Sequence, residues 1–287
     1  MDAKRKKQSQ IKEIWRRFKK NKPAMAGLIV ISVFALLVAF ADVFAPYSTV
    51  IRQDAKIRLQ PPSGEHIFGT DAFGRDIFVR ILHGGRISLT IGLLPASVAL
   101  IIGGFLGAAA GYYGRWADNL IMRIMDVLMC IPNILFTLAI IAALGPSMEN
   151  LLIALAVSCI PGYTRIVRAS ILAVVEQDYI VAARAGGTYD VRIIRRHILP
   201  NAIGPIIVFV TGSLSGMILA AAVLSFMGLG VRPPRPEWGA MVSEARDYMR
   251  TAPHLIIFPG LAIVFSALSL NLIGDGLRDA LDPRLKN

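Results

Sequence analysis

The chain has 287 residues, of which 55% are hydrophobic and only 17% are charged, against roughly 25% charged residues in soluble domains. Its formal net charge of +12 gathers near the N-terminus, while apolar runs are spread over the whole length. These features exclude a soluble globular domain and favour one polytopic membrane domain. Cys130 and Cys159 have no cysteine or histidine at ligand spacing, so we expect two small buried hydrophobic residues and no disulfide or metal.

Residues 1–23 predict a basic amphipathic segment on the cytoplasmic face of the membrane. Ten of the 31 Lys and Arg residues fall within the first 22 positions. Four apolar residues follow the spacing of one helical face: Ile11, Ile14, Trp15 and Phe18. This pattern is typical of a membrane-surface helix and argues against a nucleic-acid-binding arm. The next apolar run exceeds the roughly 7–15 residues of a signal-peptide core, so we expect an uncleaved first span.

Six segments are apolar enough to cross a bilayer, whose core of ~30 Å needs about 20 residues of helix. They are residues 24–45, 88–111, 120–144, 151–164, 203–229 and 254–273. The fourth is short, but its helix can continue while Arg165 and Arg168 reach the interface. The basic N-terminus is expected in the cytoplasm, and an even number of spans returns the C-terminal tail, residues 274–287, to that side.

The loops divide between the two sides of the membrane. Residues 46–87 and 230–253 are expected to be external loop regions. The internal loop 165–201 carries six arginines against three acidic residues, in agreement with a cytoplasmic location.

Residues 178–201, DYIVAARAGGTYDVRIIRRHILPN, interrupt the apolar pattern with four arginines, two aspartates and a Gly-Gly pair. The pattern predicts a short helix ending at Gly186-Gly187 and a second helix capped by Asp190, with Pro200 closing it or starting the next element. Such a pair would protrude as a rigid knob with a small-residue face. An ordinary solvated loop is the alternative.

Glycines at four-residue spacing, Gly103, Gly107 and Gly111, and likewise Gly212 and Gly216, predict close helix packing within the membrane. Arg123 and Asp126 can neutralise each other at i, i+3. The sequence has no GxxxxGK[ST], HExxH or GxSxG motif and no intramembrane chain of acids or histidines. We therefore expect no catalytic residue and no metal site, and any ATP must be bound by another chain.

The knob sequence is similar to the cytoplasmic loop of binding-protein-dependent ABC importers: Glu-Ala-Ala, three residues, Gly, nine residues, Ile, one residue, Leu-Pro. Five residues match this pattern, namely Ala182, Ala183, Gly187, Leu199 and Pro200. Val181 replaces the glutamate and His197 the isoleucine. Three further stretches resemble the C-type permease subunit of the dipeptide/oligopeptide importers: FGTDAFGRDIFVRILHGGRISL, FMGLGVRPPRPEWGAMVSEAR and PGLAIVFSALSLNLIGDGLRDALDPRLKN.

This resemblance implies an all-α integral membrane protein with the type I ABC importer permease fold, in which residues 88–273 form a five-helix core with a coupling loop at 176–200. It implies a multi-pass protein of a bacterial or archaeal cell (inner) membrane, embedded in membrane lipid and without a nucleic-acid partner. The expected partners are a homologous B-type permease subunit, two ATP-binding subunits and an external solute-binding protein. The chain itself would be no enzyme and bind no cofactor, because ATP and Mg would be used by the partner subunits.

The resemblance also assigns candidate site residues. The ATPase-coupling residues would be Val181, Ala182, Ala183, Arg184, Gly187, Leu199 and Pro200. In the outer loop, the candidates for docking at the membrane edge or on the binding protein are Arg232, Pro233, Pro234, Pro236, Glu237 and Trp238; a stiff structural hairpin is an equal alternative. Residues 69–76 are expected to brace the outer loop through an internal Asp–Arg contact.

The function implied is ATP-driven uptake of dipeptides or oligopeptides along a path shared with the B-type subunit. One alternative keeps the architecture and changes the cargo to a nickel chelate or glutathione. An ion-coupled secondary transporter or channel would instead need intramembrane acids and inverted repeats, which the sequence lacks. A membrane-embedded enzyme would need clustered nucleophiles, bases or metal ligands at membrane depth, which are absent as well.

Overall fold

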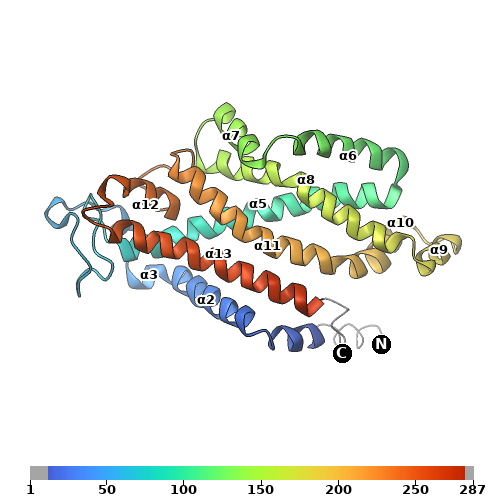
Figure 1. The fold of residues 1–287 in the computed structure, drawn as a ribbon, viewed down its shortest axis with the longest axis horizontal. Helices are drawn as coiled ribbons and strands as arrows, with labels where there is room; N and C mark the ends of the chain where they lie inside the picture. Colours follow the sequence, from blue (N-terminus) through green and yellow to red (C-terminus); the bar gives the residue numbers. More distant parts are fainter. Residues whose placement is uncertain (1–11, 282–287) are drawn as a thin grey trace.

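The computed structural model describes residues 12–281, and helices account for most of that range (Figure 1). Residues 12–18 are helical. The labelled elements are α2 (Lys22–Ala39), α3 (Ala41–Phe44), α4 (Tyr47–Ile51), η1 (Ala55–Ile57), α5 (Ile77–Tyr113), α6 (Arg115–Met129), α7 (Asn133–Leu144), α8 (Met148–Val175), α9 (Asp178–Ala185), α10 (Asp190–Ile193), η2 (Ile194–Ile198), α11 (Leu199–Phe226), α12 (Trp238–Glu244), η3 (Arg246–Tyr248) and α13 (His254–Leu281).

Five stretches of helix are long and apolar enough to cross a membrane, and a sixth span exists if α6 and α7 count as one. The predicted span 120–144 is not one straight helix, because α6 and α7 meet at 85°. Pro132 stands at this break, where it lacks an N–H for the helical ladder and disfavours helical backbone at Ile131.

The other spans have different limits from those expected. The first ends at Ala39, well before residue 45, and α5 begins at Ile77, well before residue 88. Helix α10, η2 and α11 form one continuous stretch, Asp190–Phe226. The expected tail is helical as far as Leu281, where α13 ends, and residues 282–287 lie outside the described part.

Helix α8 continues to Val175 and carries two arginines past the predicted end at residue 164. Arg165 donates to Asp126 on α6 at 2.7 Å, and Arg168 Nη2 donates to Asp118 at 2.6 Å. Asp126 is therefore paired across helices, and not with Arg123 on its own helix as the sequence suggested.

The longest helix, α5, packs along α8 through its glycines. A Cβ added at Gly107 would lie 2.5 Å from the Thr164 carbonyl oxygen, and one at Gly103 would lie 2.8 Å from Tyr163 Cβ. The predicted packing role of this glycine row is confirmed. At Gly212 and Gly216 an added Cβ meets no atom within 4 Å, but a Cβ at Gly274 of α13 would lie 3.3 Å from the Gly212 backbone nitrogen, so α13 comes close to α11 at Gly212.

Helix α11 lies between α8 and α13, and α2 runs along α13 (Figure 1). The start of α2, the end of α13 and α9 lie at one end of the molecule, which we call the α9 end; α12 lies at the opposite, α12 end. Phe18 is buried against Ala24 and Ala280 at the α9 end. Ile11, predicted on the same face as Phe18, lies outside the described residues.

The two cysteines differ from expectation in their exposure. Cys159 is partly buried, whereas Cys130 is exposed at the α6–α7 bend. Neither forms a disulfide within residues 12–281.

Candidate functional site

The most distinctive surface is the knob, residues 178–198, which comprises α9, α10 and η2 and protrudes at the α9 end (Figure 1). Helix α9 has Asp178 in its first turn and Arg184 in its last, which suits the helix dipole. It ends at Gly186, and Gly187 adopts a φ of +74°, a left-handed conformation that glycine takes without strain. The predicted first short helix and its glycine corner are confirmed, whereas the second predicted helix is the beginning of the continuous helical stretch Asp190–Phe226.

Buried isoleucines fix the knob to the long helices. Ile180 of α9, Ile193 of α10 and Ile198 of η2 are completely buried. They share one apolar cluster with Val167 and Ile171 of α8. Burying an aliphatic side chain stabilises a protein by about 1.5–3 kcal/mol, so the knob is attached firmly to α8.

A polar latch ties the same knob to α5. The Tyr112 hydroxyl donates to Asp190 at 2.5 Å, and the Arg184 guanidinium lies 4.6 Å from the centre of the Tyr112 ring. Tyr112 thus joins both short helices to the last turn of α5. The predicted capping role of Asp190 is wrong: Tyr189 is the N-cap of α10, and the Asp190 carboxylate accepts from Tyr112 instead.

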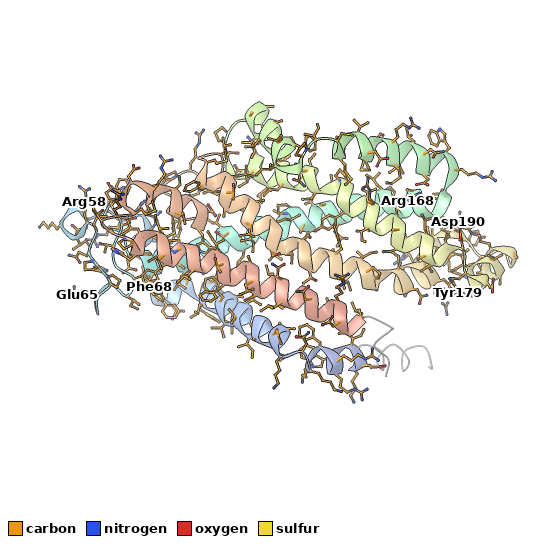
Figure 2. The ribbon with its side chains drawn as sticks, viewed as in Figure 1. Arg58, Glu65, Phe68, Arg168, Tyr179 and Asp190 are labelled. Atoms are coloured by element: carbon orange, nitrogen blue, oxygen red, sulfur yellow. The ribbon has the colours of Figure 1, made fainter. Side chains whose placement is uncertain are left out.

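The outer side of the knob is apolar and exposed. Tyr189 is 80% exposed and Val181 is 56% exposed, and Tyr179 and Val191 are exposed beside them; Figure 2 shows Tyr179 and Asp190 at this end. Among the residues proposed for coupling, Val181, Ala182, Arg184, Gly187, Leu199 and Pro200 are exposed and Ala183 is half-buried. Sequence reasoning missed Tyr179, Tyr189 and Val191, whose signal was an apolar side chain within a polar segment.

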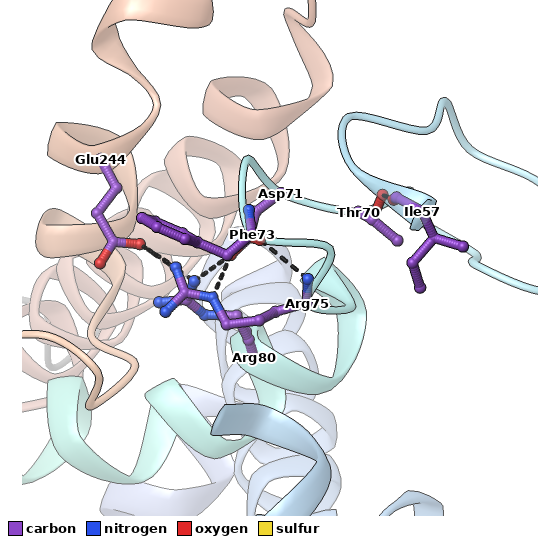
Figure 3. A network of polar contacts seen from close by, with 7 residues as sticks. All are labelled: Ile57, Thr70, Asp71, Phe73, Arg75, Arg80 and Glu244. Atoms are coloured by element: carbon purple, nitrogen blue, oxygen red, sulfur yellow. Dashed lines mark hydrogen bonds and ion pairs between the residues drawn. The ribbon is translucent and has the colours of Figure 1, made fainter. Parts of the chain in front are cut away.

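At the α12 end, an ion cluster consists of the buried residues Asp71, Arg75 and Arg80 and of half-buried Glu244 (Figure 3). Asp71 accepts from Arg75 Nε at 2.6 Å and also from Arg80, while Arg75 donates to Glu244 at 2.7 Å. Two acids and two arginines balance one another. The predicted Asp–Arg brace is confirmed, and the structure adds Arg80 and Glu244 to it.

Glu237 and Trp238 are buried at the start of α12. Trp238 Nε1 donates to the Ile81 carbonyl at 3.0 Å, and the Glu237 carboxylate accepts from the backbone N–H groups of Gly239 and Ala240. Burial raises the pKa of the Glu237 carboxyl above its usual range.

Burial therefore divides the six outer-loop candidates. Pro236, Glu237 and Trp238 are enclosed by the chain itself, in a structural role. Arg232, Pro233 and Pro234 are exposed and available to a partner.

Two cavities lie along one face of α11. The first, the α7 cavity, has a volume of about 560 Å³ and lies among α7, α8 and α11. Its polar lining includes Asn133, Ser158 and Tyr163. The second, the α13 cavity, has a volume of about 730 Å³ and is lined by α11, α13 and Ile166 of α8.

Phe209 and Ser213 line both cavities and mark their border. The Tyr163 ring packs edge-on against Phe209, with ring centres 5.1 Å apart, and its hydroxyl lies 2.5 Å from Ser213 Oγ. Among residues 12–281, no group of three His, Cys, Asp or Glu side chains could hold a metal ion. Both cavities are large enough to hold a small solute.

Comparison with protein families gives two matches. Residues 99–287 match the family described as binding-protein-dependent transport system inner membrane component. Residues 9–62 match the N-terminal TM domain of oligopeptide transport permease C.

Curated relatives extend over nearly the full chain. The dipeptide transport system permease protein DppC of Alkalihalophilus pseudofirmus is 48% identical over 96% of this chain and 90% of its own length. The glutathione transport system permease protein GsiD of Pectobacterium atrosepticum is 45% identical over 96% of this chain and 92% of its own length.

Among solved structures, the MetNI methionine ABC transporter in an inward-facing conformation contains a similar chain. The TM-score is 0.58 at 18% identity, over 72% of this chain and 98% of that one. At this identity the likeness shows a shared fold.

Proposed function

The chain belongs to the family of binding-protein-dependent transport system inner membrane components, and from this we propose that it serves an ATP-driven importer of dipeptides or oligopeptides. It is a multi-pass inner-membrane permease subunit of an ABC importer. The peptide cargo is supported by a relative described as a dipeptide transport permease and by the match to oligopeptide transport permease C.

The observation that carries the mechanism is the apolar, exposed knob locked onto two long helices. In this proposal the knob faces the cytoplasm, because the ten basic residues before residue 23 precede a helix, α2, that starts at the same end. One ATP-binding subunit would cover Val181 and its neighbours. The ATP and Mg would be bound by such partner subunits, and this chain would bind no cofactor.

The knob is well placed to transmit motion. Its isoleucines hold α8 and its Tyr112 latch holds α5, so a displacement of α9 would move both helices as one body. If nucleotide binding favours one arrangement of the ATP-binding subunits, their differential contacts with the knob shift the permease between inward-open and outward-open states.

The remaining partners would occupy other surfaces. A homologous B-type subunit would face the two cavities of α11 and complete the path. A solute-binding protein would dock at the α12 end, where Arg232, Pro233 and Pro234 are exposed.

Glutathione is the second candidate cargo, because one relative is described as a glutathione transport permease. Glutathione is itself a small peptide with free charged ends, so the same path would serve. The choice between the two cargoes would rest largely with the solute-binding protein.

A matched pair of glycine variants tests the coupling role in the complete transporter, purified with its partner subunits in lipid vesicles. Gly187 and Gly228 both have positive φ, +74° and +81°, and both have open space around an added Cβ. Gly187→Leu and Gly228→Leu should therefore strain the backbone similarly. Only Gly187→Leu should abolish the stimulation of ATP hydrolysis by a peptide-loaded binding protein; equal stimulation in both variants would contradict the proposal.

A further inference from the structure

The α13 cavity carries a pair of opposite charges at the α9 end of the molecule. Among its lining residues the ionisable side chains are Asp275 and Arg278, one turn apart on α13. Both are exposed, and neither has an ion-pair partner within residues 12–281.

This pair differs from the other charges on the long helices. Arg168 is paired with Asp118 and Arg165 with Asp126, so these charges are neutralised within the chain. Within residues 12–281, Asp275 and Arg278 keep both charges unpaired, beside a hollow that these residues leave unfilled.

The size and the largely apolar lining of the rest of the cavity suit the uncharged part of a small molecule. Its volume of about 730 Å³ lies within the ~300–1,000 Å³ of small-molecule sites. An added Cβ at Gly204 or Gly212 would meet no atom within 4 Å, so α11 presents an open surface there. Apart from Ser213 and the two charged residues, the lining is glycine, proline and apolar side chains.

We propose that Asp275 and Arg278 form a dipolar subsite for the charged ends of a zwitterionic peptide on its way through the permease, an inference that rests on the proposed peptide cargo. The Asp275 carboxylate accepts from the peptide ammonium, and the Arg278 guanidinium donates to the peptide carboxylate. The shared residues Phe209 and Ser213 connect this subsite to the α7 cavity along the same face of α11.

The test uses the complete transporter in lipid vesicles, with uptake of radiolabelled dialanine driven by ATP and a saturating binding protein. Asp275→Asn and Arg278→Gln should each lower uptake by about tenfold, the order expected for one charge-assisted hydrogen bond. Arg278→Lys keeps the charge and should retain most of the uptake. Asp279→Asn is the matched control, because Asp279 accepts from Asn21 at 3.0 Å and is outside the cavity lining.

A second readout depends on charge and not on folding. Arg278→Gln should lower the uptake of alanyl-aspartate more than that of alanyl-lysine, and Asp275→Asn should do the reverse. A purely structural role would lower both equally.

Three results would count against these ideas in different ways. Unchanged dialanine uptake in both charge-removing variants overturns the subsite and leaves the peptide cargo intact. Loss of the ATP-binding subunits from the purified variants assigns the pair to subunit docking, and also overturns the subsite. A wild-type complex that imports neither dipeptides nor tripeptides overturns the proposed cargo, and the subsite with it.

Discussion

The two ends of this molecule differ in which side chains they bury and which they expose. At the α12 end, charged residues are enclosed: Arg75 and Arg80 are buried beside Asp71 and half-buried Glu244 (Figure 3). At the α9 end, apolar residues such as Val181 and Tyr189 are exposed. The ion cluster of the first end finds its partners within this chain, whereas the exposed apolar side chains of the knob form a surface that a partner would cover.

This difference suggests that the α12 end stabilises the fold, whereas the α9 end couples the permease to a partner. A buried, neutral ion cluster fixes the loop 46–76 to α12 and has no charge left for a ligand. A protruding knob with apolar side chains outside and isoleucines inside transmits force to the helices behind it. Variants at the two ends should therefore differ in what they change: stability at one end, and partner binding at the other.

The largest effect on the stability of the permease itself is expected at Asp71. Asp71→Ala leaves Arg75 and Arg80 buried with one acid between them, which should lower the free energy of unfolding by about 3–5 kcal/mol. Thermal unfolding of the detergent-solubilised chain measures it. Asp247→Ala, at an exposed pair 3.8 Å apart, should change it by under ~1 kcal/mol; similar losses in both would erase the contrast between enclosed and exposed charges.

The next effect concerns the α5–α8 seam that joins the two ends. A Cβ at Gly107 would lie 2.5 Å from the Thr164 carbonyl oxygen, whereas at Gly104, on the same helix, it would meet nothing within 4 Å. Gly107→Ala should cost about 1–3 kcal/mol through overpacking. Gly104→Ala should be neutral or stabilise the helix by up to ~1 kcal/mol. Equal unfolding temperatures for the two variants would show that α5 and α8 can move apart at Gly107 without losing stability.

The sequence predicted what depends on neighbours along the chain. Runs of apolar residues identify the spans, and Gly186-Gly187 identifies the corner of the knob. The α6–α7 bend was missed because apolar residues continue across Ile131 and Pro132, although that proline was a visible cue.

What the sequence did not predict depends on residues that are distant in the chain. Glu244 joins Arg75 only when α12 folds back on α5. Trp238 resembles a membrane-interface anchor until Ile81 is seen to accept its N–H. The cavities of α11 likewise exist only once three separate helices meet around Phe209.

A smaller effect on stability is expected from the buried carboxyl group of Glu237 at the α12 end. Burial raises the pKa of the Glu237 carboxyl, so the folded state holds this proton to higher pH than the unfolded chain does. The group's contribution to stability is therefore full below the unfolded pKa of about 4.3 and is lost as pH rises through the folded pKa.

Glu237→Gln carries no such charge at any pH. The stability of Glu237→Gln relative to the native chain should therefore rise between pH ~4 and pH ~8, because only the native chain loses stability as its carboxyl group ionises. Thermal unfolding across this range measures it, with Glu65→Gln at an exposed site as the control. Parallel pH profiles for the native chain and Glu237→Gln would mean that the carboxylate is well solvated.

The smallest effect on stability, and the sharpest on partner binding, is expected at Val181. Val181 and Met249 are similarly exposed, at 56% and 59%, but lie at opposite ends. Aspartate at either position should change the free energy of unfolding by no more than about 0.5 kcal/mol, because neither side chain is packed.

Val181→Asp introduces a charge into an apolar contact surface, so it should reduce copurification of the ATP-binding subunit by about tenfold, the order of one unpaired charge at an interface. Met249→Asp should leave copurification unchanged. Equal retention of the ATP-binding subunit by both variants would contradict the proposal that this subunit binds the exposed apolar side chains of the knob.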